Sequence, residues 1–170
     1  ANLPASYTVD KVYLSEHAIA EARQLLLNGI NSGAALANYI GHAGMDRWAQ
    51  EGLLLSSDVS SLTNGDRLPV VTAMTCVAGR FAAPGYDALS EVLILESDGG
   101  AVAVWAPTGM SINAQAKILA QGFFQERYQQ GETILGRVVL GALEHYATHG
   151  NLPYTLDIYT LFGDPATEIK

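Results

Sequence analysis

The sequence predicts a single α/β domain with a mostly parallel sheet, and two observations carry this prediction. Short apolar or β-branched runs typical of buried strands alternate with longer segments that have helical periodicity. The chain has 170 residues, 49% of them hydrophobic, so it is expected to bury on the order of 70% of its unfolded surface in one domain. This alternation places helices on both faces of the sheet.

Each expected element ends at a turn signal. The segment 7–14 alternates polar and apolar residues in the β manner, and the segment 16–27 is an Ala- and Leu-rich helix that stops at Asn28-Gly29. A long connection, 45–67, separates the second and third strands. The expected strands are 7–14, 34–41, 68–75, 101–106 and 156–162, and the expected helices are 16–27, 87–96, 111–129 and 133–149. No internal repeat, low-complexity tract or domain boundary is evident, so residues 1–170 form one unit.

Composition excludes several function classes. The net charge is −8, from 9 Lys and Arg against 17 Asp and Glu, which argues against nucleic acid and agrees with a cationic substrate. No apolar run reaches the ~18 residues of a membrane helix, and no signal peptide opens the sequence. A single cysteine rules out an internal disulfide.

His42 and Cys76 are the candidate catalytic residues, because each follows an expected buried strand. If these strands are parallel neighbours, both side chains emerge at the carboxyl edge of one sheet, where open α/β folds place their chemistry. A thiol beside an imidazole is the minimal apparatus of a cysteine hydrolase. Gly41 and Gly44 flank the histidine, and Val77-Ala78-Gly79 after the cysteine permits a sharp turn.

Competing interpretations stay open at this point. A lone cysteine after an apolar strand is more often a small buried residue than a nucleophile, and a histidine near a strand end is often structural. His145 and His149 have ligand spacing on an expected helix, but no third ligand is evident, so no metal site is predicted. Trp105, whose strand should end at the same edge, and Thr108 nearby are candidate pocket residues.

At these residues the chain resembles the gingipain-type (C25) cysteine peptidases of the caspase-like clan. The resemblance runs in order over nearly the whole chain. Its matching stretches are 37–49 around His42, 62–64, 68–81 around Cys76, 89–91, 98–108 and 162–165.

The resemblance implies a caspase-like three-layer sandwich and endopeptidase activity. By that likeness Cys76 is the nucleophile, His42 protonates the leaving amine, and the backbone N–H groups of Ala43 and Cys76 form the oxyanion hole. The best-known members cut after Arg or Lys, often outside the cell, and bind structural calcium. The resemblance therefore implies a secreted or cell-surface protein that needs no cofactor for its chemistry.

The chain departs from the family pattern in two ways. The family usually has His-Gly, whereas His42 is followed by Ala43, which tolerates positive φ poorly. The caspase-like strand order is 2-1-3-4-5-6, and the five expected strands match the second to the sixth. The first strand, and the acidic residue that orients the histidine in characterised members, are then expected upstream of Ala1.

A sheet does not keep a central gap, because the unpaired backbone groups would be buried without partners. Either an upstream fragment of the same precursor supplies the missing strand, or the strands close up differently, or the chain is a fragment with impaired activity. Residues 1–170 are thus expected to be the C-terminal part of a longer catalytic domain.

The sequence as a whole predicts a cysteine endopeptidase that uses Cys76 and His42, with protein or peptide substrates and a preference for basic residues implied by the resemblance. The alternative is a non-catalytic caspase-like module that binds a partner or assembles a larger surface protein. A third interpretation, a structural thiol in an unrelated doubly wound protein, requires the string of motifs to be coincidental.

Overall fold

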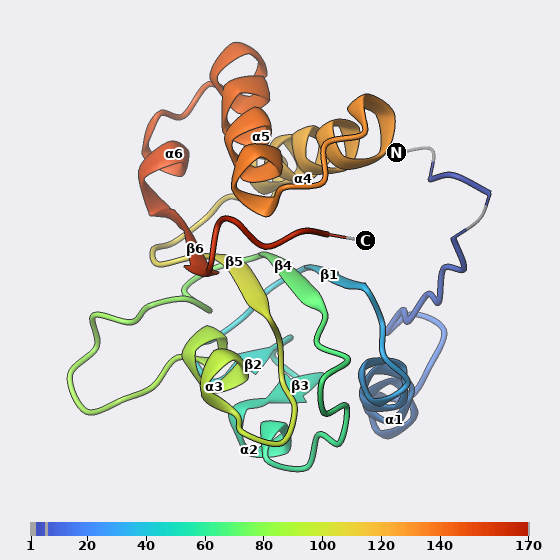
Figure 1. Cartoon of the computed structure of the whole chain (residues 1–170). Helices are drawn as coiled ribbons and strands as arrows, with labels where there is room; N and C mark the ends of the chain where they lie inside the picture. Colours follow the sequence, from blue (N-terminus) through green and yellow to red (C-terminus); the bar gives the residue numbers. More distant parts are fainter. Residues whose placement is uncertain (1–2, 6, 170) are drawn as a thin grey trace.

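The structure is a computed structural model that describes residues 3–5 and 7–169, and a four-stranded sheet forms its centre (Figure 1). The strand order is β1-β4-β5-β6, in which β1 with β4 and β4 with β5 are parallel and β5 with β6 is antiparallel. A separate hairpin, β2 with β3, lies in the long connection between β1 and β4. The strands are β1 (Leu36–Ile40), β2 (Arg47–Trp48), β3 (Leu54–Leu55), β4 (Val70–Met74), β5 (Ala103–Pro107) and β6 (Tyr159–Gly163).

Helices cover both faces of the sheet and complete a three-layer α/β sandwich, as predicted. In Figure 1, α4, α5 and α6 lie on one side of the sheet, and α1, α2 and α3 lie on the other. A π-helical turn, η1, directly follows α4, and a left-handed glycine ends it. The helices are α1 (Ile19–Asn31), α2 (Ser56–Val59), α3 (Leu89–Leu95), α4 (Asn113–Gln125), η1 (Glu126–Gln130), α5 (Leu135–His149) and α6 (Tyr154–Ile158).

Strand β4 separates two hydrophobic cores, one on each face of the sheet. Alternate residues of β4 contribute to opposite cores: Val70 and Met74 pack toward α4 and α5, whereas Val71 and Ala73 pack toward α1 and α3. This follows from the two-residue period of a strand. All five residues of β4 are buried, so the strand that leads to Cys76 lies in the interior of the molecule.

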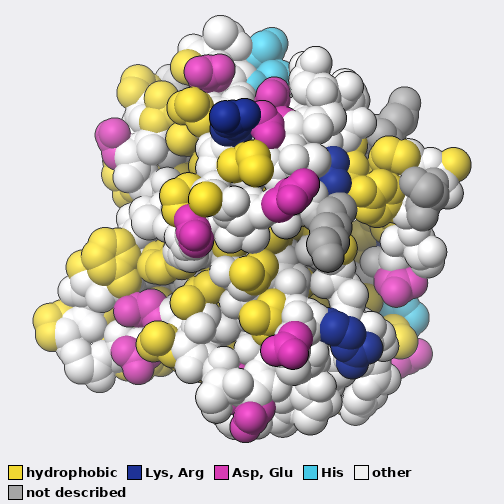
Figure 2. All heavy atoms as spheres, viewed as in Figure 1, with side chains coloured by type: hydrophobic (Ala, Val, Ile, Leu, Met, Phe, Trp, Pro, Cys, Tyr) yellow, Lys and Arg dark blue, Asp and Glu magenta, His cyan; other side chains and the backbone are white. Residues whose placement is uncertain are grey.

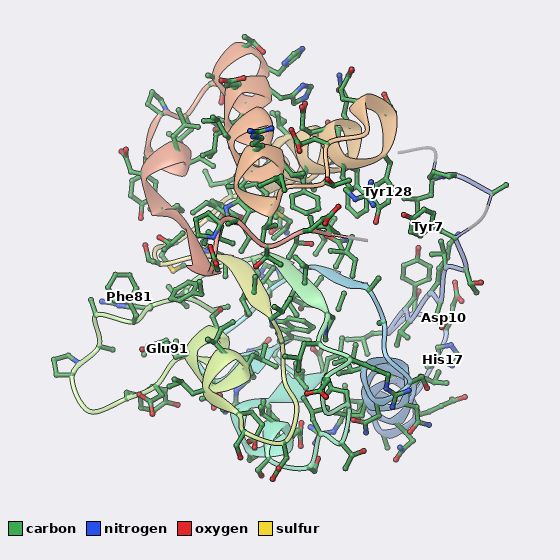
Figure 3. The ribbon with its side chains drawn as sticks, viewed as in Figure 1. Tyr7, Asp10, His17, Phe81, Glu91 and Tyr128 are labelled. Carbon is green, nitrogen blue, oxygen red and sulfur yellow. The ribbon has the colours of Figure 1, made fainter. Side chains whose placement is uncertain are left out.

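The expected strand 7–14 is wrong, because this segment forms no strand in the structure. The Tyr7 ring instead packs edge-on against Tyr128 with 5.1 Å between centroids (Figure 3), and the Tyr7 hydroxyl accepts a hydrogen bond from Arg127 at 3.2 Å. An alternating pattern becomes a strand only when a neighbouring strand pairs with its backbone. Here side-chain contacts with η1 hold the segment away from the sheet.

The expected strand 156–162 is half right. Residues up to Ile158 belong to α6, and the strand begins only at Tyr159. Pro153 precedes this helix with φ −54°, a backbone angle that suits the first turn of a helix. The apolar run is therefore shared between a helical turn and a short strand.

The described sheet has no central gap, because the segment 7–14 takes no part in it. Strand β1 forms one edge of the sheet, and its backbone hydrogen bonds to β4 come from odd-numbered positions. Directly before and after the strand, Ala35 accepts a hydrogen bond from Val70 at 3.1 Å, and Gly41 donates one to Met74 at 3.4 Å. The even-numbered residues of β1 direct their backbone groups to the open side. These residues are Leu36, Asn38 and Ile40.

The surface reflects the acidic composition. In Figure 2, Asp and Glu side chains are scattered over the visible face and outnumber Lys and Arg. Among the described residues, no helix has both the length and the apolar character needed to cross a membrane.

Asn64 connects the loop before β4 to the turn before β5. Its side chain is 2% exposed, and its amide donates to the carbonyl oxygens of Gly100 at 3.0 Å and Arg67 at 3.2 Å. The side-chain oxygen of Asn64, Oδ1, accepts a hydrogen bond from the Gly100 N–H at 3.0 Å. The bonds join two segments that lead into neighbouring parallel strands, so Asn64 helps to set the relative position of β4 and β5.

We expect Asn64→Ala to lower the free energy of unfolding by about 2–4 kcal/mol, because it leaves buried backbone groups of the two loops without partners. Urea unfolding measures the change. Asn151→Ala is the matched control, because Asn151 is exposed and its side chain makes no hydrogen bond within the described residues. The role of Asn64 would be contradicted by an equal effect of the two substitutions.

Candidate active site

The β1–β4 pairing brings His42 and Cys76 to the same edge of the sheet. In the register of the two strands Ile40 lies opposite Met74, and the Gly41 N–H still bonds to Met74 beyond the end of β1. His42 and Cys76 each lie two residues beyond this last pair. Because paired strands lie about 4.8 Å apart, the two chain segments leave the sheet side by side.

A tyrosine on β1 fixes the loop that carries His42. The Tyr39 hydroxyl donates to the His42 carbonyl oxygen at 2.6 Å and accepts the Ala49 N–H at 2.8 Å. The Ala49 N–H also bonds to the His42 carbonyl at 2.8 Å, and the Tyr39 ring stacks on Trp48 at 4.8 Å between centroids. Burial raises the pKa of Tyr39, so this hydroxyl keeps its proton at neutral pH.

Gly41 leaves room for this tyrosine. A Cβ atom at position 41 would lie 2.5 Å from the Tyr39 hydroxyl oxygen, which is too close for any real contact. The glycine before His42 is thus required by the side chain that anchors the loop, rather than by an unusual backbone angle. His42 itself is exposed at the surface.

Ala43 fits its position without backbone strain. Among the described residues only Ala49 and Val77 combine a positive φ with a side chain, so the change from the family's His-Gly to His-Ala has no conformational cost here. Ala43 lies opposite Trp48 in an isolated antiparallel bridge. The two hydrogen bonds of this bridge are made by the flanking residues: the Gly44 N–H donates to Arg47, and the Ala49 N–H donates to His42. Ala43 and Trp48 are therefore a non-hydrogen-bonded pair, and their own N–H groups point away from each other.

Cys76 is partly buried and contacts the loop after β5. Its thiol donates to the carbonyl oxygen of Ser111, with 3.2 Å between Sγ and oxygen. The Ser111 hydroxyl lies 3.1 Å from the hydroxyl of Tyr159, the first residue of β6. The thiol is therefore held by a segment 35 residues further along the chain.

The residue after Cys76 has a strained backbone. Val77 has φ 41°, a left-handed conformation that is unusual for a β-branched side chain. The Val77 N–H donates to Gly109 at 3.0 Å, and the Gly79 N–H donates to Pro107 at 3.0 Å, so the turn is held against the end of β5. Strain of this kind costs on the order of 1–3 kcal/mol and is concentrated at functional sites.

An open depression lies on the His42 side of the edge. It has a volume of about 490 Å³ and is lined by His42, Ala43, Gly44, Arg47 and Gln50. Arg47 pairs with its neighbour Asp46 at 2.6 Å, and the hydrogen bond from Arg47 holds the pKa of the Asp46 carboxyl below its usual range.

The site lacks an acidic partner for the histidine within the described part of the chain, where the His42 ring makes no hydrogen bond to a carboxylate. The sequence placed that acid upstream of Ala1, and this expectation stays a prediction. The structure also brings no group of three His, Cys, Asp or Glu side chains of the described residues together as a metal site. Structural calcium stays a prediction as well.

The two candidate pocket residues lie in different surroundings from those expected. Trp105 is fully buried in the core, between Phe123 at 5.7 Å and Tyr159 at 5.6 Å between ring centroids, so it faces no open pocket. Thr108 is half-buried, and both its N–H and its hydroxyl bond to the Ile158 carbonyl, at 2.7 and 3.1 Å. These two residues support the β5–β6 end of the site from behind.

His145 and His149 stack on each other at the end of α5, with 4.1 Å between ring centroids. Burial and the neighbouring His149 lower the pKa of His145. Nδ1 of His149 lies 2.8 Å from the backbone oxygen of His145, so that nitrogen is already in use. The pair is a helix-end contact remote from Cys76 in the fold.

Sequence reasoning missed three residues that build the site: Tyr39, Ser111 and Tyr159. For Tyr39 a signal existed, because it lies on the strand that leads to His42 and precedes that residue by three positions. For Ser111 and Tyr159 the sequence offered none, since each meets Cys76 only through the folding of the sheet.

Comparison with known proteins agrees with the family that the sequence resembles. A family model described as peptidase family C25 matches residues 1–170. Gingipain R2 of Porphyromonas gingivalis (strain W83) is 28% identical over 159 residues, covering 85% of this chain and 21% of the relative. Gingipain R1 of Porphyromonas gingivalis is 26% identical over 158 residues, covering 85% of this chain and 15% of the relative. The chain thus spans about a fifth or less of these relatives.

Solved structures show the same fold. The crystal structure of the Arg-specific cysteine proteinase gingipain R has a TM-score of 0.80 at 23% identity, covering 87% of this chain and 36% of that one. The complex of Porphyromonas gingivalis RgpB pro- and mature domains gives 0.79 at 23% identity, covering 87% and 37%. These likenesses confirm the caspase-like sandwich.

We expect Tyr39→Phe to destabilise the His42 loop while leaving the stack on Trp48 in place. The lost hydroxyl should lower the free energy of unfolding by about 1 kcal/mol and speed hydrogen exchange at the Ala49 amide. Tyr13→Phe is the control, because Tyr13 is 48% exposed and its hydroxyl makes no hydrogen bond within the described chain. Unchanged exchange at Ala49 in Tyr39→Phe would contradict the anchoring role.

Proposed function

Because the chain belongs to peptidase family C25, we propose that it acts as a cysteine endopeptidase in which Cys76 is the nucleophile and His42 the general acid and base. The observation that carries this proposal is the β1–β4 register, which puts the two residues at one level of one sheet edge. A family match alone gives the class of reaction. The register supports these two residues as its agents.

The proposed reaction needs only these two side chains. His42 takes the thiol proton, and the Cys76 sulfur attacks the scissile carbonyl carbon to form a tetrahedral intermediate. The C–N bond then breaks, His42 gives its proton to the leaving amine, and an acyl-enzyme remains. Water, deprotonated by His42, cleaves the thioester and releases the acid and the free thiol.

The backbone N–H groups of Ala43 and Cys76 are the proposed oxyanion donors. Within the described chain neither N–H makes a hydrogen bond, and the bridge opposite Trp48 accounts for this at Ala43. Preorganised, unpaired donors beside a nucleophile stabilise the charge that develops on the carbonyl oxygen. The strained turn at Val77 supports the same assignment, because it sets the direction of the backbone directly after Cys76.

Cleavage after basic residues is the finer part of the proposal. Its support is the net charge of −8 and the match to gingipains R1 and R2, since an acidic protein attracts cationic peptides. The described site shows Arg47, a cation, in the depression beside His42. A basic side chain is therefore proposed to bind away from that depression.

The open edge of β1 is the proposed docking site for a further strand, supplied by an upstream fragment of the same precursor. Unpaired backbone groups of Leu36, Asn38 and Ile40 lie along this edge, and Ile40 exposes 50% of its surface. An open edge of this kind is a template for pairing with another segment. Such a strand would lie next to His42, where the expected acidic partner belongs.

We expect Cys76→Ala and His42→Ala each to lower kcat/KM for an Arg-containing peptide by at least about a thousandfold, because each removes a reacting group. Cleavage is measured with the protein as isolated from its source, and Glu144→Ala, an exposed change on α5, is the control. Cys76→Ala that cleaves as fast as the parent would rule out the proposed mechanism.

The same material tests the alternative, a non-catalytic caspase-like module. A peptidyl acyloxymethyl ketone should label Cys76 rapidly in the parent and slowly in His42→Ala. Indifference of the parent thiol to this reagent would support the non-catalytic module instead.

We expect Ile40→Lys to reduce the amount of upstream fragment that co-purifies with the chain by about threefold or more, because a charge on an edge strand opposes pairing. Intact-mass analysis and N-terminal sequencing measure the fragment. Leu95→Lys is the control, since Leu95 is 73% exposed on α3, away from β1. Recovery of the parent chain without a fragment would refute the docking proposal.

A further inference from the structure

The contact between Cys76 and Ser111 links the nucleophile to β6. The thiol donates to the Ser111 carbonyl oxygen at 3.2 Å, and the Ser111 hydroxyl lies 3.1 Å from the Tyr159 hydroxyl. A carbonyl oxygen only accepts hydrogen bonds, so the thiol is the donor in this contact. The contact therefore holds the thiol hydrogen at the Ser111 carbonyl oxygen.

Tyr159 is well suited to hold Ser111 in this place. It is only 6% exposed, and its ring packs against Trp105 in the core, so its hydroxyl has a fixed position. Burial raises the pKa of Tyr159 well above its usual value, which keeps the phenol protonated at any pH at which the fold is assayed. Its hydroxyl is thus a permanent neutral hydrogen-bonding group.

We propose that Tyr159 is a positioning residue that acts through Ser111 to hold the Cys76 thiol in hydrogen-bonding contact with the Ser111 carbonyl oxygen in the resting state. The thiol leaves the Ser111 carbonyl when its proton passes to His42. Loosening Ser111 weakens the contact that the thiol must leave before it reacts, so the sulfur reacts more readily. The inference concerns the reactivity of the thiol itself. It rests on the proposed role of Cys76 only for its consequence in catalysis.

Few other titratable groups face Cys76 from the elements packed around it. His42 lies at the end of β1, and Tyr159 lies on β6, with Tyr146 of α5 behind it. Arg80 follows on the loop after the nucleophile and is exposed. His42 and Arg80 are unchanged in the variants below, so they contribute equally to the pH profile of every variant.

The test is the pH dependence of alkylation of Cys76 by iodoacetamide, which is unambiguous because the chain has one cysteine. We expect Tyr159→Phe and Ser111→Ala each to react about threefold faster than the parent at pH 7, because each change loosens the contact that holds the thiol. The double variant should show no further increase, because both changes interrupt one chain of contacts. Ser111→Thr, which keeps the hydroxyl, should restore the parent profile.

Tyr146→Phe is the matched control. Tyr146 is 2% exposed in the same core, and its hydroxyl bonds to Gln115 and to Leu152 rather than to the loop of Ser111. A parent-like profile in this variant, with a raised one in Tyr159→Phe, supports the proposal. Parent-like profiles in both Tyr159→Phe and Ser111→Ala, or equal increases in both tyrosine variants, would overturn it.

Two features keep this test decisive. Should Tyr159→Phe fail to fold, Ser111→Ala carries the test alone, because Ser111 lies in a partly exposed loop. Alkylation needs no peptide cleavage. The role of Tyr159 can therefore be refuted while the peptidase function is supported, and the peptidase function can be refuted while the role of Tyr159 is supported.

Discussion

Parallel pairing between β1 and β4 is the interaction on which the candidate site depends. It carries His42 and Cys76 to one edge, two residues beyond the last register pair, and everything else at the site adjusts the two loops that follow. Because β4 is buried on both faces, the position of Cys76 is fixed by two hydrophobic cores at once. Strand β1 has a neighbour on one side only, so the histidine side of the site depends more on local anchors.

Two tyrosines supply anchors on opposite sides of the sheet edge that carries His42 and Cys76. Tyr39 bonds to the His42 carbonyl and Tyr159 to Ser111, and both hydroxyls are part-buried groups whose pKa is raised by burial. A neutral hydroxyl serves here because it both donates and accepts without adding a charge beside His42 and Cys76. The segments that carry these two residues are thus held by neutral hydrogen bonds, and the strained turn at Val77 is stabilised by contacts with the end of β5.

Much of the fold could be predicted from the sequence, because buried strands and helices carry strong apolar patterns. Strands β1, β4 and β5 and the helices α3, α4 and α5 lie within a few residues of their expected positions. The failures have a common cause. Residues 7–14 alternate as a strand does but meet Tyr128 and Arg127 instead of a strand partner, and residues 156–158 follow a proline that starts a helix. Periodicity describes a segment, whereas pairing needs a neighbour.

The sequence by itself determined the class of the protein: an α/β domain of a cysteine peptidase family, with one thiol and one histidine each placed after a buried strand. Only the tertiary structure decided the register that brings these residues to one level, the burial of Trp105 in the core, and the ordinary backbone angle of Ala43. It alone revealed Ser111 and Tyr159, which lie 35 and 83 positions beyond Cys76. Local patterns encode which face of an element is buried, but contacts between distant segments arise only when the sheet and its two cores assemble.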